Sequence, residues 1–205
     1  MKLACDQCEY PLILTPQFNL KINGRVEEKT VGEYTEVIKA CKNIFEKKTK
    51  DYGTAWRILR TSSLTDQIFI KAKRIRSIQE KGEQKIQEDI GGEFIAIINY
   101  CIMAILQSRI DERQGLEISY EELQPQYDTV VNETRNLLMN KNHDYDEAWR
   151  DMRVSSMTDI ILMKILRTKQ IEDNQGKTLI SEGVDANYQD MINYSVFCLI
   201  LLKFV

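Results

Sequence analysis

The stretch DYGTAWR at Asp51–Arg57 returns as DYDEAWR at Asp144–Arg150, and this repetition decides the fold. The match continues downstream, where SSLTD at Ser62–Asp66 pairs with SSMTD at Ser155–Asp159. Other positions hold the same residues in both copies: Lys71 and Lys164, Arg74 and Arg167, Ile98–Tyr100 and Ile192–Tyr194. A duplication of this length fixes the architecture before any other feature is interpreted.

Both copies have the apolar spacing of amphipathic helices. In the first copy, a helix is expected to end near Lys50, a second to run from Ser62 or Ser63 to Lys81, and a third to span roughly Gly92–Gln107. Ser62 or Ser63 is the expected N-cap, and Gly82 is the expected end of the second helix. The second copy predicts helices near 126–140, 158–173 and 185–203. We therefore predict an all-α fold, a pseudo-symmetric bundle of two tandem three-helix repeats.

The predicted boundaries are repeat 1 at 31–112, a linker at 113–124 and repeat 2 at 125–205, with both repeats in one globular unit. Ser119 and Glu122 fit a capping box, and Pro125 fits the first turn of the next helix. Residues 1–30 have no counterpart in the second copy. Because Asn23-Gly24 is a turn signal and Phe18, Leu20 and Ile22 alternate, we expect a short hairpin or an irregular leader there.

Composition describes a soluble globular chain, with 43% hydrophobic and 29% charged residues. A formal net charge of −3 argues against direct nucleic-acid binding by backbone neutralisation. The apolar run Val196–Leu202 is far shorter than the ~20 residues of a membrane span. No signal peptide is evident, so a cytoplasmic location is expected by elimination.

The five cysteines are odd in number and lie mostly in apolar helical contexts, as reduced cysteines do. Cys5 and Cys8 form a lone C-x-x-C, which lacks the second pair of ligands that zinc requires. The only histidine, His143, is replaced by Lys50 in the other copy, so a catalytic role for it is not expected.

The last helix gathers acidic residues on one face, provided that it begins early enough to include Glu182. At 100° per residue, Glu182, Asp190 and Asn193 fall at about 0°, 80° and 20°, and Asp185 lies near about −60°. Carboxylate and amide oxygens are ligands that magnesium prefers. The alternative is that Glu182 and Asp185 favour a helix N-terminus, whereas Asp190 lies deeper and is either a ligand or a partner within the fold.

The equivalent acidic face of the first copy is mostly lost, because Gly91 and Ala96 replace Asp185 and Asp190. A single site is therefore expected on the second repeat.

A basic pair at a spacing of three lies on one helix face in each copy. Lys164 and Arg167, like Lys71 and Arg74, are candidates for gripping phosphate oxygens. Lys164 interrupts an apolar run, so it either meets a ligand or forms a salt bridge within the fold.

Trp149 and Tyr145 are candidates for stacking on a base, and burial at a helix–helix turn is the alternative. Asp144, like Asp51, is either a cap or a ligand. Asp66 and Asp159 fit carboxylates at helix starts.

These motifs carry a resemblance. The order Lys-x-x-Asp-Tyr, Trp-Arg, Lys-x-x-Arg and Asp-x-x-Asn-Tyr resembles the nucleotide-modification-associated domain family, first catalogued as a domain of unknown function. The chain resembles its tandem bacterial form over about residues 31–203, and the second repeat carries every motif. The family name implies a role near nucleotide or modified-base metabolism.

A second, more distant resemblance is to MazG-type all-α nucleoside triphosphate pyrophosphatases, which hold magnesium on E-x-x-E and E-x-x-D helices. Glu33-x-x-Glu36 and Glu182-x-x-Asp185 match those spacings. The resemblance implies a magnesium-dependent nucleotide-binding protein, a possible pyrophosphohydrolase. In it Glu182, Asp185 and Asp190 would hold the metal with help from Glu33 and Glu36, and Asp144 and Asn193 would support them.

The rival hypothesis is a non-catalytic helical module that binds a nucleotide or a protein. In this alternative, Lys164 and Asp190 are a buried ion pair. A homodimer is compatible with both hypotheses.

Overall fold

The computed structural model describes residues 16–82, 89–145, 147–178 and 182–204. Across these residues the chain forms six α-helices and no strand, with short 3-10 turns between them. The helices are α1 (Pro16–Tyr52), α2 (Thr61–Lys81), α3 (Ile90–Arg109), α4 (Tyr120–Tyr145), α5 (Val154–Asp173) and α6 (Val184–Leu201). The 3-10 turns are η1 (Ala55–Ile58), η2 (Glu112–Gln114) and η3 (Ala148–Asp151). The prediction of an all-α fold built from two repeats is confirmed.

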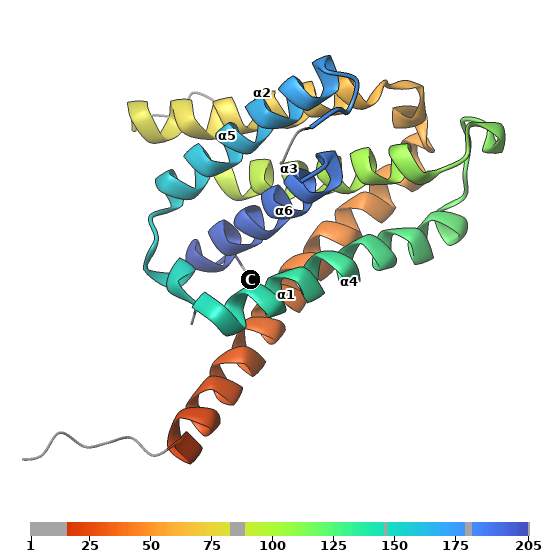
Figure 1. Ribbon diagram of the computed structural model, residues 1–205. Helices are drawn as coiled ribbons and strands as arrows, with labels where there is room; N and C mark the ends of the chain where they lie inside the picture. Colours follow the sequence, from red (N-terminus) through yellow and green to blue (C-terminus); the bar gives the residue numbers. More distant parts are fainter. Residues whose placement is uncertain (1–15, 83–88, 146, 179–181, 205) are drawn as a thin grey trace, which may run out of the picture.

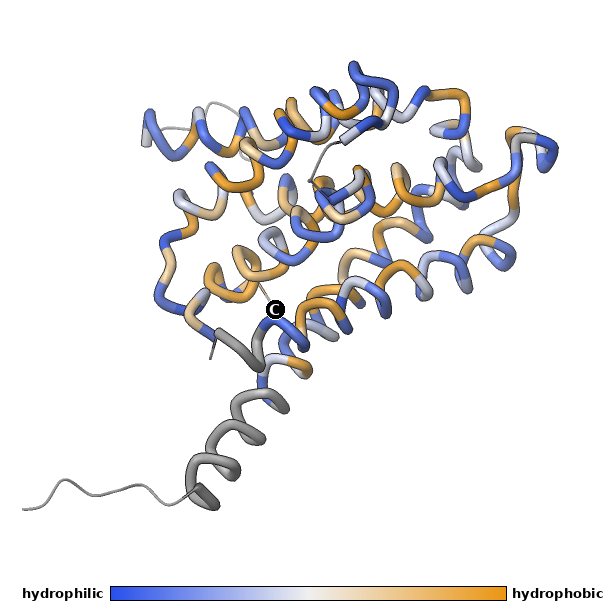
Figure 2. Tube along the Cα trace, in the orientation of Figure 1, coloured by the Kyte–Doolittle hydropathy of each residue, from blue (hydrophilic) through white to orange (hydrophobic). Residues whose placement is uncertain are grey.

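The helices lie in three layers, and each layer pairs equivalent helices of the two repeats (Figure 1). The α3/α6 pair is central, with α2/α5 on one side and α1/α4 on the other. Each helix therefore packs against both repeats, and the two halves share one core. Figure 2 shows the apolar residues gathered on the faces that the helices turn toward one another.

Helix α3 is long and apolar enough to cross a membrane by length and composition alone, yet 67% of its apolar window is buried within the bundle. Its role is that of a core helix. Cys41, Cys101 and Cys198 are buried and free, as expected of small apolar side chains. Burial raises the pKa of the Cys41 thiol to about 12.

Two equivalent asparagines connect the repeats. The amide of Asn99 in α3 donates to the Cys41 carbonyl (3.1 Å) and accepts from the Tyr127 hydroxyl (3.0 Å). In α6, the amide of Asn193 donates to the Thr134 carbonyl (3.3 Å) and accepts from the Tyr34 hydroxyl (3.3 Å). Each asparagine thus binds the first helix of its own repeat and a tyrosine of the other.

The α2/α5 layer repeats this exchange at its surface. Asp66 accepts from Lys169 at 2.5 Å, and the equivalent Asp159 lies 3.6 Å from Arg76. Because both ion pairs cross from one repeat to the other, a pseudo-twofold relation runs through the whole bundle.

The expected hairpin or irregular leader is wrong for residues 16–30, because α1 begins at Pro16 and runs through Asn23-Gly24. Proline suits a first helical turn. Extending an existing helix adds a hydrogen bond with each residue, so a weak turn signal beside a long helix is overridden. Residues 1–15, with Cys5 and Cys8, lie outside the described residues.

Helix starts also differ from expectation. Arg60 and Arg153, rather than Ser62, Ser63 or their equivalents, precede α2 and α5. Neither arginine makes a side-chain capping hydrogen bond. Gly82 ends α2 in the left-handed conformation, as predicted.

The capping box at the start of α4 is confirmed. The Glu122 N–H donates to Ser119 Oγ (3.2 Å), and the Ser119 N–H donates to Glu122 Oε2 (3.1 Å). Helix α4 therefore begins at Tyr120, inside the expected linker, and Pro125 lies within the helix rather than at its first position.

Candidate functional site

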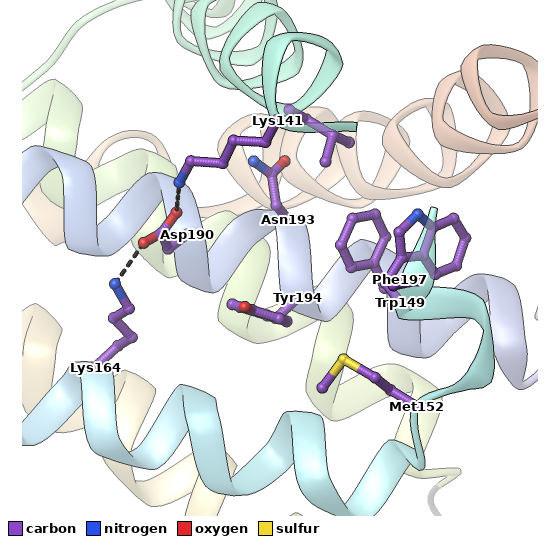
Figure 3. A pocket seen from close by; sticks show the side chains of 10 residues that line it. Lys141, Trp149, Met152, Lys164, Asp190, Asn193, Tyr194 and Phe197 are labelled. Atoms are coloured by element: carbon purple, nitrogen blue, oxygen red, sulfur yellow. Dashed lines mark hydrogen bonds and ion pairs between the residues drawn. The ribbon is translucent and has the colours of Figure 1, made fainter. Parts of the chain in front are cut away.

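A cavity of about 430 Å³ opens in the second repeat, between α4, η3, α5 and α6 (Figure 3). We call it the repeat-2 pocket. It is lined by Leu138, Lys141, Ala148, Trp149, Met152, Lys164, Asp190, Asn193, Tyr194 and Phe197. The residues come from four separate segments of the chain, so the pocket exists only in the assembled bundle.

One end of the pocket is charged. Asp190, on α6, accepts from Lys141 Nζ on α4 through Oδ1 (2.9 Å) and from Lys164 Nζ on α5 through Oδ2 (2.5 Å). The Asp190 and Lys164 side chains are only 10% and 14% exposed, whereas Lys141 is 43% exposed. The carboxylate thus joins three helices at the pocket wall.

The electrostatics of this trio favour the ionised forms of Asp190 and Lys141. Burial opposes the charged form of Asp190, but the hydrogen bonds and charges of Lys164 and Lys141 outweigh it and lower the carboxyl pKa. Burial likewise opposes the charge on Lys141, and its hydrogen bond to Asp190 outweighs that effect and raises the lysine pKa. Two cations and one anion therefore leave this end with a net positive charge.

The other end is apolar and aromatic. The Trp149 ring stacks on Phe197, with centroids 4.1 Å apart and planes 4° from parallel. The Arg150 guanidinium lies 4.4 Å from the Trp149 centroid, so it must cover the opposite face. The prediction that Trp149 stacks on a base is therefore wrong, because both faces of its indole are occupied. Trp149 forms a wall instead.

Tyr194 lies between the two ends. It is half-buried, and its ring meets Phe197 edge to face at 6.1 Å. Burial and the nearby Asp190 charge raise the pKa of its phenol, so the hydroxyl stays protonated. Tyr194 is the aromatic side chain best placed to meet a ligand.

Asn193 has a supporting position. Its amide is engaged on both sides by Thr134 and Tyr34, so it fixes the wall of the pocket rather than reaching into it. Since Tyr34 belongs to α1, the first repeat helps to shape the pocket of the second.

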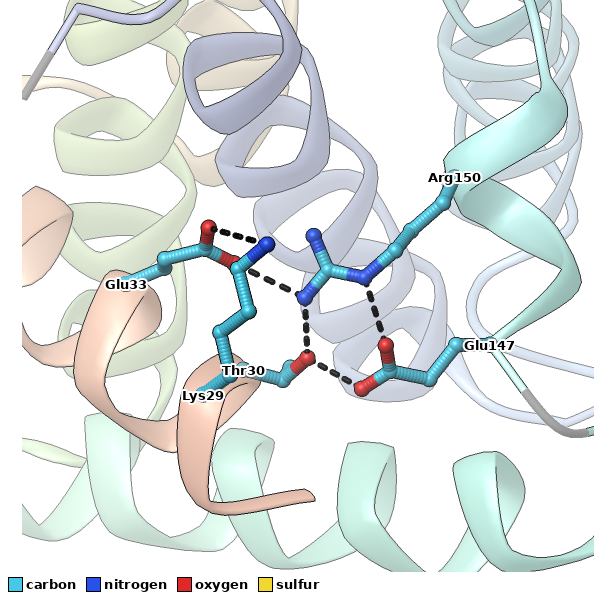
Figure 4. Close-up of polar contacts among 5 residues, drawn as sticks. All are labelled: Lys29, Thr30, Glu33, Glu147 and Arg150. Atoms are coloured by element: carbon cyan, nitrogen blue, oxygen red, sulfur yellow. Dashed lines mark hydrogen bonds and ion pairs between the residues drawn. The ribbon is translucent and has the colours of Figure 1, made fainter. Parts of the chain in front are cut away.

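A polar cluster anchors η3 to α1 (Figure 4). Arg150 donates through Nε to Glu147 (2.5 Å) and through Nη2 to Thr30 (2.6 Å) and Glu33 (2.8 Å). Glu147 is buried and has a left-handed backbone with φ 55°, a costly conformation for a residue other than glycine. The cluster holds Arg150 against Trp149 and so positions the aromatic wall.

The acids predicted to hold magnesium do not gather. Among the described residues, no group of three or more His, Cys, Asp or Glu side chains is arranged to hold a metal ion. Glu33 binds Arg150, Glu36 lies 3.6 Å from Lys39, and Asp185 lies 3.2 Å from Arg109. Helix α6 begins at Val184, so Glu182 precedes it and does not share the helical face with Asp190. The predicted acidic face required a helix that includes Glu182, and α6 does not meet that condition.

The residues predicted to bind phosphate lie in different places. Lys71 (3.2 Å) and Arg74 both contact Glu93, a carboxylate that is 5% exposed. Arg167 is exposed and does not line the pocket, whereas Lys164 does. The lysine at this position is paired with a carboxylate in both repeats.

Lys141 and Tyr194 belong to the predicted motifs but were not assigned to the site. A signal was present, since Lys48-x-x-Asp51 matches Lys141-x-x-Asp144, and Tyr100 matches Tyr194. The side chains of His143, Asp144 and Tyr145 lie outside the described residues.

Two segments of the chain, residues 48–108 and 141–202, each match one protein-family model, described as nucleotide modification associated domain 1. Every described residue that lines the pocket, apart from Leu138, falls within the second matched segment. No curated protein and no solved structure matches the chain.

Proposed function

Since the chain belongs to the nucleotide modification associated domain 1 family, we propose that its repeat-2 pocket binds a nucleotide. The lysine end receives phosphate, and the apolar end around Tyr194 and Met152 receives the base. The observation that carries this proposal is the division of one cavity into a cationic end and an aromatic end. Ligand pockets combine apolar walls with a few placed polar groups in this way.

The volume supports a ligand of mononucleotide size. At about 430 Å³ the cavity lies within the range of roughly 300–1,000 Å³ of small-molecule sites.

Magnesium dependence and pyrophosphate release stay predictions. Asp190 lines the pocket, and the charge of Glu182 acts on Lys141, so these two acids are the nearest candidates for a metal that arrives with a nucleotide. A metal there would polarise a phosphoryl group and lower the pKa of an attacking water.

The test is a panel of nucleoside mono-, di- and triphosphates, with and without magnesium, scored for thermal shift and for pyrophosphate release. We expect a rise in melting temperature with at least one nucleotide, because a ligand of the native state stabilises it. No shift across the whole panel would overturn the proposal. A shift without turnover would leave a binding protein and refute the hydrolase prediction.

Lys141→Ala and Lys48→Ala are a matched pair for locating the site. The two lysines are equivalent, and Lys48 is exposed in the first repeat. Because the Lys141 side chain is already 43% exposed, its loss should leave the fold intact while weakening nucleotide binding by roughly tenfold. Equal effects of the two substitutions would exclude the repeat-2 pocket as the site.

The second candidate is a non-catalytic module in which Asp190 only holds helices together. It is favoured by one observation, the engagement of both carboxylate oxygens by lysines. Asp190→Ala alone cannot separate the candidates, since it leaves buried Lys164 unpaired.

The first repeat supplies a cleaner variant. Glu93 is equivalent to Asn187, and Ala96 to Asp190, so the double variant N187E/D190A gives Lys164 a carboxylate from the position used in repeat 1. We expect it to fold and to bind a nucleotide with an affinity different from that of wild type. Unchanged binding and turnover would favour the purely structural role.

A further inference from the structure

Asp190 lies between two lysines and connects them through its carboxylate. Each ammonium group meets a different oxygen of the one carboxylate, and the lysines come from different helices. An anion with two adjacent oxygens is therefore already built into the charged end of the pocket.

The first repeat indicates that packing does not require a carboxylate at this place. There the equivalent lysine, Lys71, is balanced by Glu93, which lies one helical turn earlier and is 5% exposed. The position of Asp190 is occupied by Ala96. The counter-ion of the lysine at this position can thus lie away from the pocket wall.

The charges around Asp190 also favour the replacement of its carboxylate by an anion of the ligand. Among the described residues that line the pocket, Lys141 and Lys164 are the cations and Asp190 is the anion, so this trio has a net positive charge. Lys141 is 43% exposed, so one of the two contacts is accessible from solvent.

From this geometry we propose that Asp190 is an internal counter-ion that occupies a phosphate subsite, and that the ligand is a nucleoside monophosphate. This inference rests on the proposed function and names its substrate class. On binding, two phosphate oxygens replace the Asp190 oxygens on Lys141 and Lys164.

A monophosphate fits the charge that is present. A single phosphoryl group has enough oxygens for both ammonium groups. Among the described residues that line the pocket, the further phosphates of a triphosphate would find no cation besides Lys141 and Lys164, because Arg167 does not line it. A buried phosphate without a cation is strongly disfavoured.

The inference predicts a gain of affinity on removing a pocket charge. In Asp190→Asn the competing carboxylate is gone and both lysines are available. Calorimetric titration of the full chain with the four deoxynucleoside 5′-monophosphates should give about tenfold tighter binding of the preferred one than in wild type. A nucleoside triphosphate without metal should bind more weakly than the monophosphate.

The same titration is made with inorganic phosphate alone and with the nucleoside of the preferred monophosphate. Binding of phosphate alone, with no further gain from the monophosphate, would overturn the assignment of a nucleotide ligand. Equal or weaker monophosphate binding by Asp190→Asn, in a wild-type protein that does bind nucleotides, would overturn the counter-ion role and leave the proposed function standing. No binding of any nucleotide to either protein, in this titration and in the wider nucleotide panel, would overturn both.

A second variant serves as the control for a failure to fold. If Asp190→Asn fails to fold, N187E/D190N supplies a carboxylate to Lys164 from the repeat-1 position and still clears the pocket wall. Monophosphate binding tighter than in wild type is then expected, and equal or weaker binding would refute the inference.

Discussion

Lys71 in the first repeat and Lys164 in the second occupy equivalent positions, yet they meet carboxylates one helical turn apart. Glu93 lies deep between α2 and α3 and also binds Arg74. Asp190 lies at the edge of a cavity and also binds Lys141. A partly buried lysine at this position therefore has a counter-ion in both repeats, but the position of that counter-ion is not fixed. One copy could therefore place its carboxylate where a ligand has access.

The largest expected effect is removal of either carboxylate. Asp190→Ala should lower the free energy of unfolding by about 3–5 kcal/mol, because Lys164, only 14% exposed, loses its partner. Glu93→Ala should cost less, because Lys71 is 29% exposed and can reach water. Urea denaturation measures the loss. Glu36→Ala, at a side chain that is 59% exposed, is the control and should cause no measurable change. A loss below about 1 kcal/mol for Asp190→Ala would contradict a structural contribution by this ion pair.

The next effect is recovery by moving the charge. N187E/D190A should regain at least about half of the stability that Asp190→Ala loses, because neighbouring substitutions of this kind are strongly non-additive. The mirror variant E93N/A96D should likewise be more stable than Glu93→Ala. Denaturation of the two series side by side checks the equivalence of the repeats. Simple additivity in both series would show that the two sites are not interchangeable.

A smaller effect is expected for the tyrosines that cross between repeats. Tyr127→Phe and Tyr34→Phe each remove a buried hydrogen bond to an asparagine and should cost about 1–2 kcal/mol. The shorter contact of Tyr127 (3.0 Å against 3.3 Å) predicts the larger loss. Tyr34→Phe should in addition weaken nucleotide binding, since Asn193 lines the pocket and Asn99 does not. The reverse order of binding effects would place the site in the first repeat.

The smallest effect is expected at the surface of the α2/α5 layer. Asp66→Ala and Asp159→Ala break equivalent ion pairs whose acids are 60% and 61% exposed. Each should change the free energy of unfolding by at most about 0.5 kcal/mol, because water and salt screen such pairs. Thermal melts at low and high salt test this, and a large difference between the two would break the pseudo-twofold comparison.

Much of the fold could be predicted from the sequence because the two copies of the repeat could be compared with each other. Helical spacing identified the helices, Gly82 ended α2, and Ser119 with Glu122 began α4. Residues 16–30 were misjudged because their helix is an extension of a segment that is stable for other reasons. The predicted starts of α2 and α5 are wrong. A serine indicates an N-cap only where the N–H groups of the next residues have no other partner, and these helices begin earlier, after Arg60 and Arg153.

The candidate site was less accessible to prediction. The sequence predicts that Asp190 and Lys164 each need a ligand or a partner within the fold, because charges inside apolar runs are costly, and the structure pairs them with each other. Their common partner Lys141 and the covered faces of Trp149 depend on α4, η3 and α6 meeting in space. No spacing along one helix contains that information.

By itself, the sequence determined that this protein is all-α, that it is duplicated, and that the second copy carries the fuller set of motifs. Local periodicity and self-comparison suffice for these properties. The tertiary structure decided which charges neutralise one another, because an acid on one helix is paired by cations from others. In the folded chain the predicted metal ligands Glu33 and Asp185 pair with two different arginines, and two lysines contact the one carboxylate of Asp190. The reason is physical: electrostatic energy depends on distance in space and on burial, and neither is fixed until the helices pack.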